Sequence, residues 1–100
     1  EKMGAKYDQG KIRHTLLPWR GVEEVTKVLE FGAKKYAENG WRSVPNGRRR
    51  YIDACFRHVV SYVQGEKTDP ESGLPHLAHA ACCLLFILEL NKDEESQKTA

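Results

Sequence analysis

The spacing of hydrophobic and polar positions predicts three helices, and the last of them is the most apolar. Between Ala78 and Leu88 the polar side chain is that of His79, and Leu and Ala favour helix. The run is too short to span a bilayer. We expect a helix from about Pro75 to Leu90, with Pro75 in the first turn, where its missing N–H loses nothing.

Two further helices are expected earlier in the chain. Residues 20–38 carry an apolar stripe at spacings of three and four, made of Val22, Val25, Leu29, Gly32, Ala33 and Tyr36. Residues 47–66 follow a loop, with Asn46 as a candidate N-cap. The predicted core stripe of this second helix is Ile52, Cys55, Phe56, Val59 and Val63.

Together these patterns predict an all-α fold: three main helices after an irregular N-terminal arm. We divide the chain into a basic arm at 1–19, a helical domain at 20–91 and a polar tail at 92–100. A hundred residues form one domain, and a chain this small buries a limited fraction of its surface. An apolar third helix must be covered on most sides, so we expect oligomerisation to complete the bundle.

Composition says more about the cellular compartment of the protein than about its function. The 16 Lys and Arg residues nearly balance the 14 Asp and Glu residues, so charge favours no partner class, and no nucleic-acid partner is expected. Three cysteines, two of them adjacent, make a poor disulfide framework. The sequence shows neither a signal peptide nor a transmembrane segment. We therefore expect a cytoplasmic protein with no membrane partner.

Candidate metal ligands lie at the start of the third helix. His76, His79 and Cys83 follow one another at i, i+3 and i+7, a spacing that can supply nitrogen and sulfur ligands to a transition metal. The alternative is structural, because His-x-x-His pairs occur by chance and Cys83 suits a packed core. A lone helical histidine such as His58 is interpreted in the same way, as a structural residue.

Carboxylates and cations elsewhere could complete such a site. If the helices bundle, oxygen donors come from Glu23, Glu30, Asp69 and Glu71. Gly10 permits a turn in the arm that brings Lys11 and Arg13 together to grip a phosphate, and further cations occur at Lys34 and residues 48–50. A solvated basic surface is the competing interpretation. A divalent ion framed by carboxylates, Lys and Arg is what triphosphate chemistry needs.

At this point the chain resembles the phage-associated dATP/dGTP diphosphohydrolase family, which is similar to the all-α, MazG-like nucleoside triphosphate pyrophosphohydrolases. The resemblance covers about residues 6–90 and is carried by Lys6-Tyr7-Asp8-x-Gly10-Lys11-x-Arg13, Leu16-Leu17-Pro18, Val28-Leu29-Glu30-Phe31-Gly32-Ala33-Lys34-Lys35-Tyr36, Trp41-Arg42, Arg57-His58 and Asp69-Pro70-Glu71-Ser72-Gly73-Leu74-Pro75-His76-Leu77-Ala78-His79-Ala80.

The resemblance implies an oligomeric all-α enzyme that cleaves a nucleoside triphosphate to monophosphate and pyrophosphate with Mg²⁺ or Mn²⁺, in the host cytoplasm if a phage encodes it. The chain departs from the MazG-like pattern, because it has no Glu-x-x-Glu motif and His76 and His79 occupy the later acidic motif. Imidazoles suit Mg²⁺ poorly. Three outcomes follow: a softer transition metal, a site built on the remaining carboxylates, or binding without hydrolysis.

The leading hypothesis is metal-dependent hydrolysis of purine (deoxy)nucleoside triphosphates. Its metal ligands are His76, His79 and Glu30, and its catalytic carboxylates are Glu30, Asp69 and Glu71, with Asp53 as a further candidate. The nucleotide, with its base stacked on Trp41, Tyr36 or Phe31, would be held by Lys11, Arg13, Lys34, Lys35, Tyr36, Trp41, Arg48, Arg49, Arg50 and Arg57.

Two alternatives use the same residues differently. In the first, the protein sequesters a nucleotide or cyclic nucleotide at a subunit interface without hydrolysing it, and the two histidines are structural. In the second, the chain is a structural oligomerisation module. The second alternative leaves the basic arm and the run from Arg48 to Arg50 without a function.

Overall fold

The computed structural model describes residues 4–99, and side chains to residue 97, as an all-helical chain. Its helices are α1 (Trp19–Lys35), α2 (Gly47–Val63) and α3 (His76–Thr99), with short 3₁₀ turns η1 (His14–Leu16) and η2 (Gly40–Ser43). In the described residues the extended pairing is an isolated antiparallel bridge between Thr68 and Pro75. The expected fold class is confirmed. The predicted arm and tail also include residues 1–3 and 100, which lie outside the described residues.

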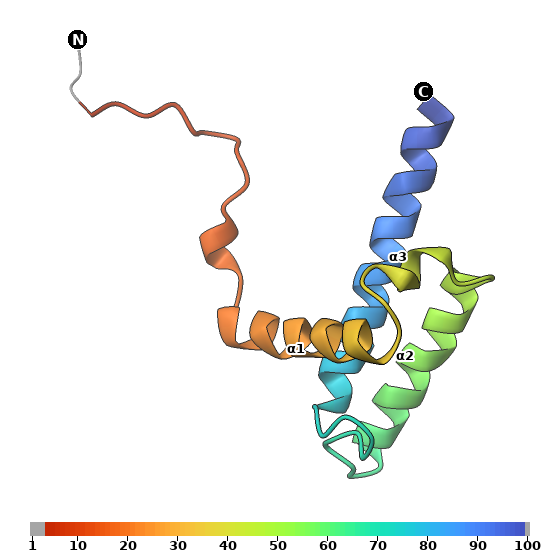
Figure 1. Cartoon of the computed structure of the whole chain (residues 1–100). Coiled ribbons are helices and arrows are strands. Elements are labelled where there is room, and N and C mark those ends of the chain that lie inside the picture. The colour runs from red at the N-terminus through yellow and green to blue at the C-terminus, as the bar shows by residue number, and fades with distance from the viewer. Residues whose placement is uncertain (1–3, 100) are drawn as a thin grey trace.

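The helices α2 and α3 run alongside each other in opposite directions, and α1 crosses α3 (Figure 1). A loop at residues 64–75 joins α2 to α3 at one end of this pair. At the other end, η2 contacts both helices. The N-terminal arm leads away from the helices (Figure 1) and makes the expected turn, in which the Lys11 N–H donates to the Asp8 carbonyl at 3.0 Å and Gly10 takes φ +84°.

The core is made of small side chains. Val28 of α1 packs with Ala78 and Cys82 of α3, and Val25, Leu74 and Phe86 surround this cluster. Small residues on α3 let the other two helices approach its backbone closely. At the η2 end, the rings of Trp41 and Phe86 stack at 4.3 Å, and the Tyr51 hydroxyl donates to the Trp41 carbonyl at 2.8 Å.

The third helix is longer than predicted. It does not end at Leu90 but continues to Thr99, because its polar second half finds cationic partners. The Arg42 guanidinium of η2 lies 3.1 Å from the Asp93 carboxylate and 3.5 Å from that of Glu89. Arg48 of α2 donates to Asn91 at 2.8 Å and also pairs with Glu94. These four exposed polar contacts hold the extension against η2 and α2.

The first helix is shorter than predicted. It ends at Lys35, with Tyr36 at its C-cap, rather than running to Glu38. Asn39 does adopt the left-handed conformation, at φ 58°, but it precedes η2 instead of capping α1. The second helix begins at Gly47 as predicted and ends at Val63 rather than Glu66. Asn46 is at its N-cap position without a capping hydrogen bond from its side chain.

The prediction for the core face of α2 was wrong within a single chain. Phe56 is 65% exposed and Val63 is 75% exposed. Of the predicted stripe, Cys55 is half-buried as expected, and Tyr51, Ala54 and His58 of α2, which were not predicted for this face, are half-buried with it. The chain is also open, with a radius of gyration of 17.3 Å against about 13 Å for a compact domain of this length. Whether oligomerisation closes it stays a prediction. None of the described helices is long and apolar enough to span a membrane.

The packing of α3 makes a prediction for thiol chemistry. Burial raises the pKa of Cys82 to about 12 and that of Cys83 to about 11, so neither forms the reactive thiolate at mildly alkaline pH. We expect iodoacetamide to label both residues only after denaturation, as mapped by mass spectrometry of peptides. Half-buried Cys55 serves as the internal comparison. Equal labelling rates for all three thiols in the native chain would contradict this packing of α3.

Candidate metal centre

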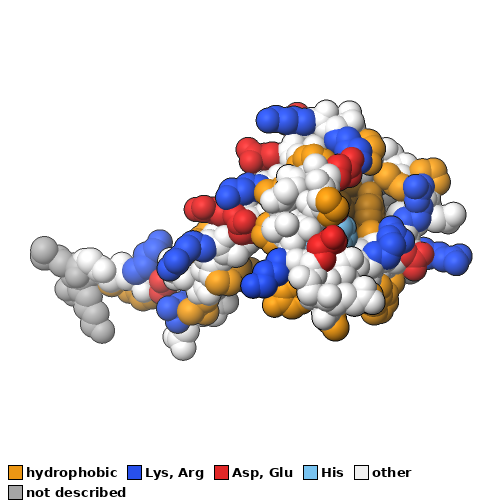
Figure 2. All heavy atoms as spheres, turned by 90° about the horizontal axis from the view of Figure 1, so that it is seen from below, with side chains coloured by type: hydrophobic (Ala, Val, Ile, Leu, Met, Phe, Trp, Pro, Cys, Tyr) orange, Lys and Arg blue, Asp and Glu red, His pale blue; other side chains and the backbone are white. Residues whose placement is uncertain are grey.

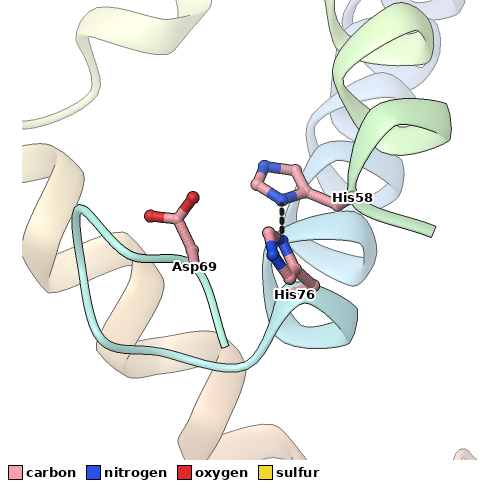
Figure 3. Close-up of side chains that lie close together, drawn as sticks. All are labelled: His58, Asp69 and His76. Carbon is pink, nitrogen blue, oxygen red and sulfur yellow. Dashed lines mark hydrogen bonds between the residues drawn. The ribbon is translucent and has the colours of Figure 1, made fainter. Parts of the chain in front are cut away.

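Three histidines and a carboxylate gather where α2 ends and α3 begins. His58 comes from α2, Asp69 from the loop at 64–75, and His76 and His79 from the first turn of α3. Figure 3 shows His58 above His76 with Asp69 beside them. His58, Asp69 and His79 are half-buried, so solvent reaches this cluster. Figure 2, which looks at the molecule from below, shows acidic, basic and hydrophobic side chains mixed over this face.

The two closest histidines face each other through the same ring atom. His58 Nδ1 lies 2.8 Å from His76 Nδ1 (Figure 3). One ligand atom from each of His58, Asp69 and His76 lies within 4.8 Å of the others. Two nitrogens and one oxygen thus surround a common point. In the absence of a cation, one of the two Nδ1 atoms has to carry the proton of a hydrogen bond between them.

A carboxylate fixes the proton of His76. The His76 ring is 3% exposed, and its Nε2 lies 2.7 Å from Glu66 Oε1. A carboxylate accepts hydrogen bonds only, so Nε2 of His76 carries the proton. In the neutral ring, Nδ1 then presents its lone pair toward His58 and Asp69. A carboxylate that orients a histidine in this way is characteristic of histidines that ligate metals.

His79 lies beside this group, and its ring is held from three sides. The ring stacks on His58 at 4.6 Å with an interplanar angle of 12°, and Phe31 of α1 approaches it edge-on at 6.4 Å. Its Nε2 lies 2.7 Å from Ser72 Oγ. The Ser72 N–H donates in turn to Asp69 Oδ2 at 2.9 Å. One serine therefore positions both the carboxylate and the adjacent imidazole.

The loop conformation that carries Asp69 depends on Gly73. Its N–H donates to the Asp69 carbonyl at 2.7 Å, and its φ of +71° lies in the left-handed region that glycine adopts without strain. The Asp69 N–H donates back to the Leu74 carbonyl at 2.8 Å. This turn therefore supports a potential ligand.

The protonation states suit metal binding. Burial lowers the pKa of His58, and the neighbouring rings of His79 and His76 lower it further. Burial also lowers the pKa of His79, against the opposing effect of Asp69. Burial by itself would raise the pKa of Asp69, but hydrogen bonds from Ser72 outweigh it and the net shift is downward. At neutral pH these two imidazoles are neutral and the carboxylate is charged, which are the forms that bind metals.

The chemistry of the donor atoms indicates which metal ion this group of residues would bind. Two imidazoles and one carboxylate, accessible from one side, are typical of sites for zinc, manganese or iron that leave positions for water or substrate. Mg²⁺ prefers oxygen ligands in an octahedron, and this group offers a single carboxylate. The residues present therefore fit a transition metal better than Mg²⁺.

Several residues predicted for the site lie at this end of the molecule. His76 and Asp69 belong to the group of three, and His79 is adjacent. Lys35 Nζ at the end of α1 lies 2.5 Å from the Glu71 carboxylate, which links α1 to the loop. Four other predicted residues lie near this end. Phe31 and Lys34 are on α1, Tyr36 is its C-cap, and Arg57 adjoins His58 on α2.

Other predicted residues lie elsewhere. Among the described residues, Glu30 is exposed on α1 and is not part of the three-residue group. Asp53 is exposed along α2. Lys11 and Arg13 are exposed on the arm, away from the helices (Figure 1). Near the opposite end of α2, about 15 Å from His58 along the helix axis, lie Trp41, Arg48, Arg49 and Arg50.

Sequence reasoning interpreted His58 as structural, whereas the structure groups it with potential ligands, and it left Cys83 open between a metal ligand and a core residue. His58 was interpreted as structural because no second ligand is near it in the sequence, and its neighbours in space come from residues 69–79. The pairing of α2 with α3 is what brings them together. Cys83 is 8% exposed, and its pKa is raised by burial and by Cys55. It packs in the core, as the structural interpretation proposed.

The geometry predicts which histidines bind a transition metal. After the chain has been freed of metal, we expect added Zn²⁺ or Mn²⁺ to stabilise the fold, because the unfolded chain has no preformed site. At 100 times the dissociation constant, the gain in free energy of unfolding is about 2.7 kcal/mol. His58→Ala, Asp69→Ala and His76→Ala should abolish this rise in melting temperature. His14→Ala is the matched control, since His14 lies exposed in η1. Equal metal effects in all four variants would contradict the assignment.

The Glu66 contact makes a separate prediction. Glu66→Gln keeps an acceptor for the His76 Nε2–H but removes the negative charge, so the basicity of Nδ1 falls. We expect metal affinity to weaken about tenfold in titrations followed by calorimetry. Glu38→Gln, in the exposed turn after α1, should leave the affinity unchanged. An unchanged affinity in Glu66→Gln would show that this carboxylate does not support the ligand.

Comparison with known proteins identifies the family. A family model described as dATP/dGTP diphosphohydrolase, N-terminal, matches residues 1–100. A dATP/dGTP diphosphohydrolase of Salmonella phage PMBT28 is 41% identical over 87 residues, which is 87% of this chain and 29% of that protein. The chain thus spans less than a third of the length of this relative, and no solved structure matches it. The chain belongs to the family of N-terminal dATP/dGTP diphosphohydrolase domains.

Proposed function

We propose that this domain takes part in hydrolysing dATP or dGTP to the monophosphate and pyrophosphate, and that its histidine centre is where the triphosphate reacts. The observation that carries the proposal is the convergence of His58, Asp69 and His76 on a common point. The family and the phage relative supply the substrate class. Because nucleotide pools are cytoplasmic, we place the activity in the cytoplasm of an infected host.

The three ligands would hold a divalent transition metal. Such an ion neutralises phosphate oxygens and lowers the pKa of a bound water. Glu66 keeps the Nδ1 lone pair of His76 pointing inward, and Ser72 holds Asp69 in place. The chain itself supplies two imidazole nitrogens and one carboxylate oxygen, held in fixed positions at the rim of the molecule.

Hydrolysis also needs a proton acceptor. Water adds to the α-phosphorus, the bond from that phosphorus to the bridging oxygen breaks, and pyrophosphate leaves. A neutral imidazole can take the proton that the water loses. His79 is the remaining imidazole of the cluster, and its lowered pKa keeps it neutral at neutral pH. The hydrogen bond of its Nε2 with Ser72 Oγ orients the ring.

Cations near the centre would bind the leaving pyrophosphate. Lys35 is held at the rim by Glu71, and Arg57 adjoins His58 on α2. Both side chains are within the part of the surface that surrounds the histidines. Glu71 is thereby assigned to positioning Lys35, and Asp69 to holding the metal. Lys34 follows the same edge of α1 and extends this basic surface.

The sequestration alternative gains no support from the structure. Binding without hydrolysis relies on the basic residues, and these are spread over the arm, the last turn of α1 and the N-terminal end of α2. A three-ligand group with open positions is not needed for sequestration. We therefore retain hydrolysis as the proposed function.

The proposal is tested by measuring the turnover of dATP and dGTP by the chain after it has been reloaded with Mn²⁺, Zn²⁺ or Mg²⁺. A reaction with a chelator and no added metal is the negative control. We expect monophosphate and pyrophosphate with a transition metal and little product with Mg²⁺. His58→Ala and Asp69→Asn should lower turnover by about a hundredfold or more, and His14→Ala should not change it. Recovery of intact nucleotide under every metal condition would overturn the proposal.

A further inference from the structure

A cavity with basic walls lies at the end of the helix pair opposite the histidine centre. Its volume is about 480 Å³, which is within the range of small-molecule sites. The charged side chains that line it come from η2 and from the first turn of α2, and they are Arg42, Arg48 and Arg49. The neutral part of the lining is formed by Val44, Asn46, Gly47 and Leu90. We call this space the arginine cavity.

Two of the three guanidinium groups are held in place by the chain itself. The guanidinium carbon of Arg42 lies 4.4 Å from the centre of the Trp41 ring, and the group pairs with two carboxylates of α3. Arg48 donates to Asn91 on α3 and pairs with one further carboxylate there. A side chain that is already ordered loses less entropy when it binds a ligand, so these contacts favour binding.

The carboxylates of α3 do not line the cavity, so the charged part of its wall is positive. Each guanidinium has five N–H donors, and the contacts with α3 engage only some of them. The side chains of Arg42 and Arg48 remain 43% and 48% exposed. Within the described part of the chain, the Arg49 side chain has neither an ion pair nor a hydrogen bond. Donors from all three arginines are therefore free to meet an anion.

The place of these arginines in the fold also favours an anion. The amide dipoles of a helix give its N-terminus a partial positive charge, so cations in the first turn destabilise the helix. Arg48, Arg49 and Arg50 occupy this turn of α2, and no acidic residue shares it. Of the three, Arg48 is paired with a carboxylate. A bound anion would offset the remaining repulsion.

The chemistry of the lining points to phosphate. A guanidinium group binds phosphate oxygens through parallel N–H donors in one plane. Three such groups around one space suit a ligand with more than one phosphate. Along the axis of α2, Arg48 lies about 15 Å from His58. A phosphate chain bound at the histidine centre therefore does not occupy the arginine cavity as well.

We propose that the arginine cavity binds the diphosphate group of a small molecule, at a site separate from the histidine centre. Two sources carry this group, namely free pyrophosphate and the phosphate chain of a nucleotide. The site stands on the cavity and its arginines, so it does not depend on the proposed hydrolysis of dATP or dGTP.

Titration calorimetry with inorganic pyrophosphate tests the site. We expect one pyrophosphate to bind per chain in the presence of a chelator, because the arginines need no metal. Arg49→Gln should weaken binding by about tenfold, since it removes a charge-assisted contact. Arg50→Gln is the matched control, because it changes the charge equally in the same turn and Arg50 does not line the cavity. Equal weakening in both variants, or no binding to the parent chain, would overturn the proposal.

The variant His58→Ala separates this site from the histidine centre. It removes a potential metal ligand and leaves the cavity intact, so the affinity for pyrophosphate should be unchanged. Loss of binding in this variant would place the pyrophosphate at the histidine centre and refute a separate site. The titration measures no turnover, so it decides the proposal even if the chain hydrolyses neither dATP nor dGTP.

Trp41 provides a second measurement that needs no arginine variant. The chain has two tryptophans, so Trp19→Phe leaves Trp41 as the single one. A ligand that attracts Arg42 alters the cation–π contact of its guanidinium with the Trp41 ring. We expect a fluorescence change that saturates at one pyrophosphate per chain. An unchanged Trp41 signal at saturating pyrophosphate would contradict the placement in the cavity.

A comparison of ligands identifies the source of the diphosphate group. Pyrophosphate, dATP and deoxyadenosine are titrated in turn with the chelator present. Tighter binding of pyrophosphate would assign the site to the free anion, and equal or tighter binding of dATP would assign it to a nucleotide. Deoxyadenosine should not bind. If it binds as tightly as dATP, phosphate is not what the cavity recognises and the proposal fails.

Discussion

The close contact between α2 and α3 is the constraint on which the rest of the structure depends. Ala80 and Cys83 on α3 are buried and small, and Cys83 neighbours Cys55 of α2, so the α2 backbone can approach until imidazoles from the two helices meet nitrogen to nitrogen at 2.8 Å. Larger side chains at these positions would separate the helices and dissolve the group of potential ligands. The packing that stabilises the chain and the geometry that could hold a metal therefore have the same cause.

The contact between α2 and α3 buries polar groups in a small domain, where each of them needs a hydrogen-bond partner. Three histidines and Asp69 are buried or half-buried in a chain whose apolar core is a handful of residues. Unpaired, such groups destabilise the fold by about 1–3 kcal/mol each. Glu66 and Ser72 satisfy them, and a bound cation would replace the Nδ1–Nδ1 contact with two ligand bonds. Metal binding and folding should therefore be thermodynamically coupled in this domain.

The distribution of charge separates two ends of the molecule. The histidine centre lies where α2 ends, and the arginine run lies where α2 begins. In one chain these features are too far apart for a single triphosphate.

The sequence by itself determined the helices, the turn at Gly10 and the starts of α2 and α3 to within a residue, because periodicity and turn residues are local properties. It also singled out His76 and Asp69 as candidate ligands, whose role stays a prediction. Tertiary structure decided which faces are buried, how far α3 extends, and that His58 joins the cluster. These depend on which helix pairs with which, and on salt bridges such as Arg42–Asp93. The apolar stripe of α2 was predicted as a buried face, but most of it is exposed in the chain, because a one-dimensional pattern does not say which face another helix covers.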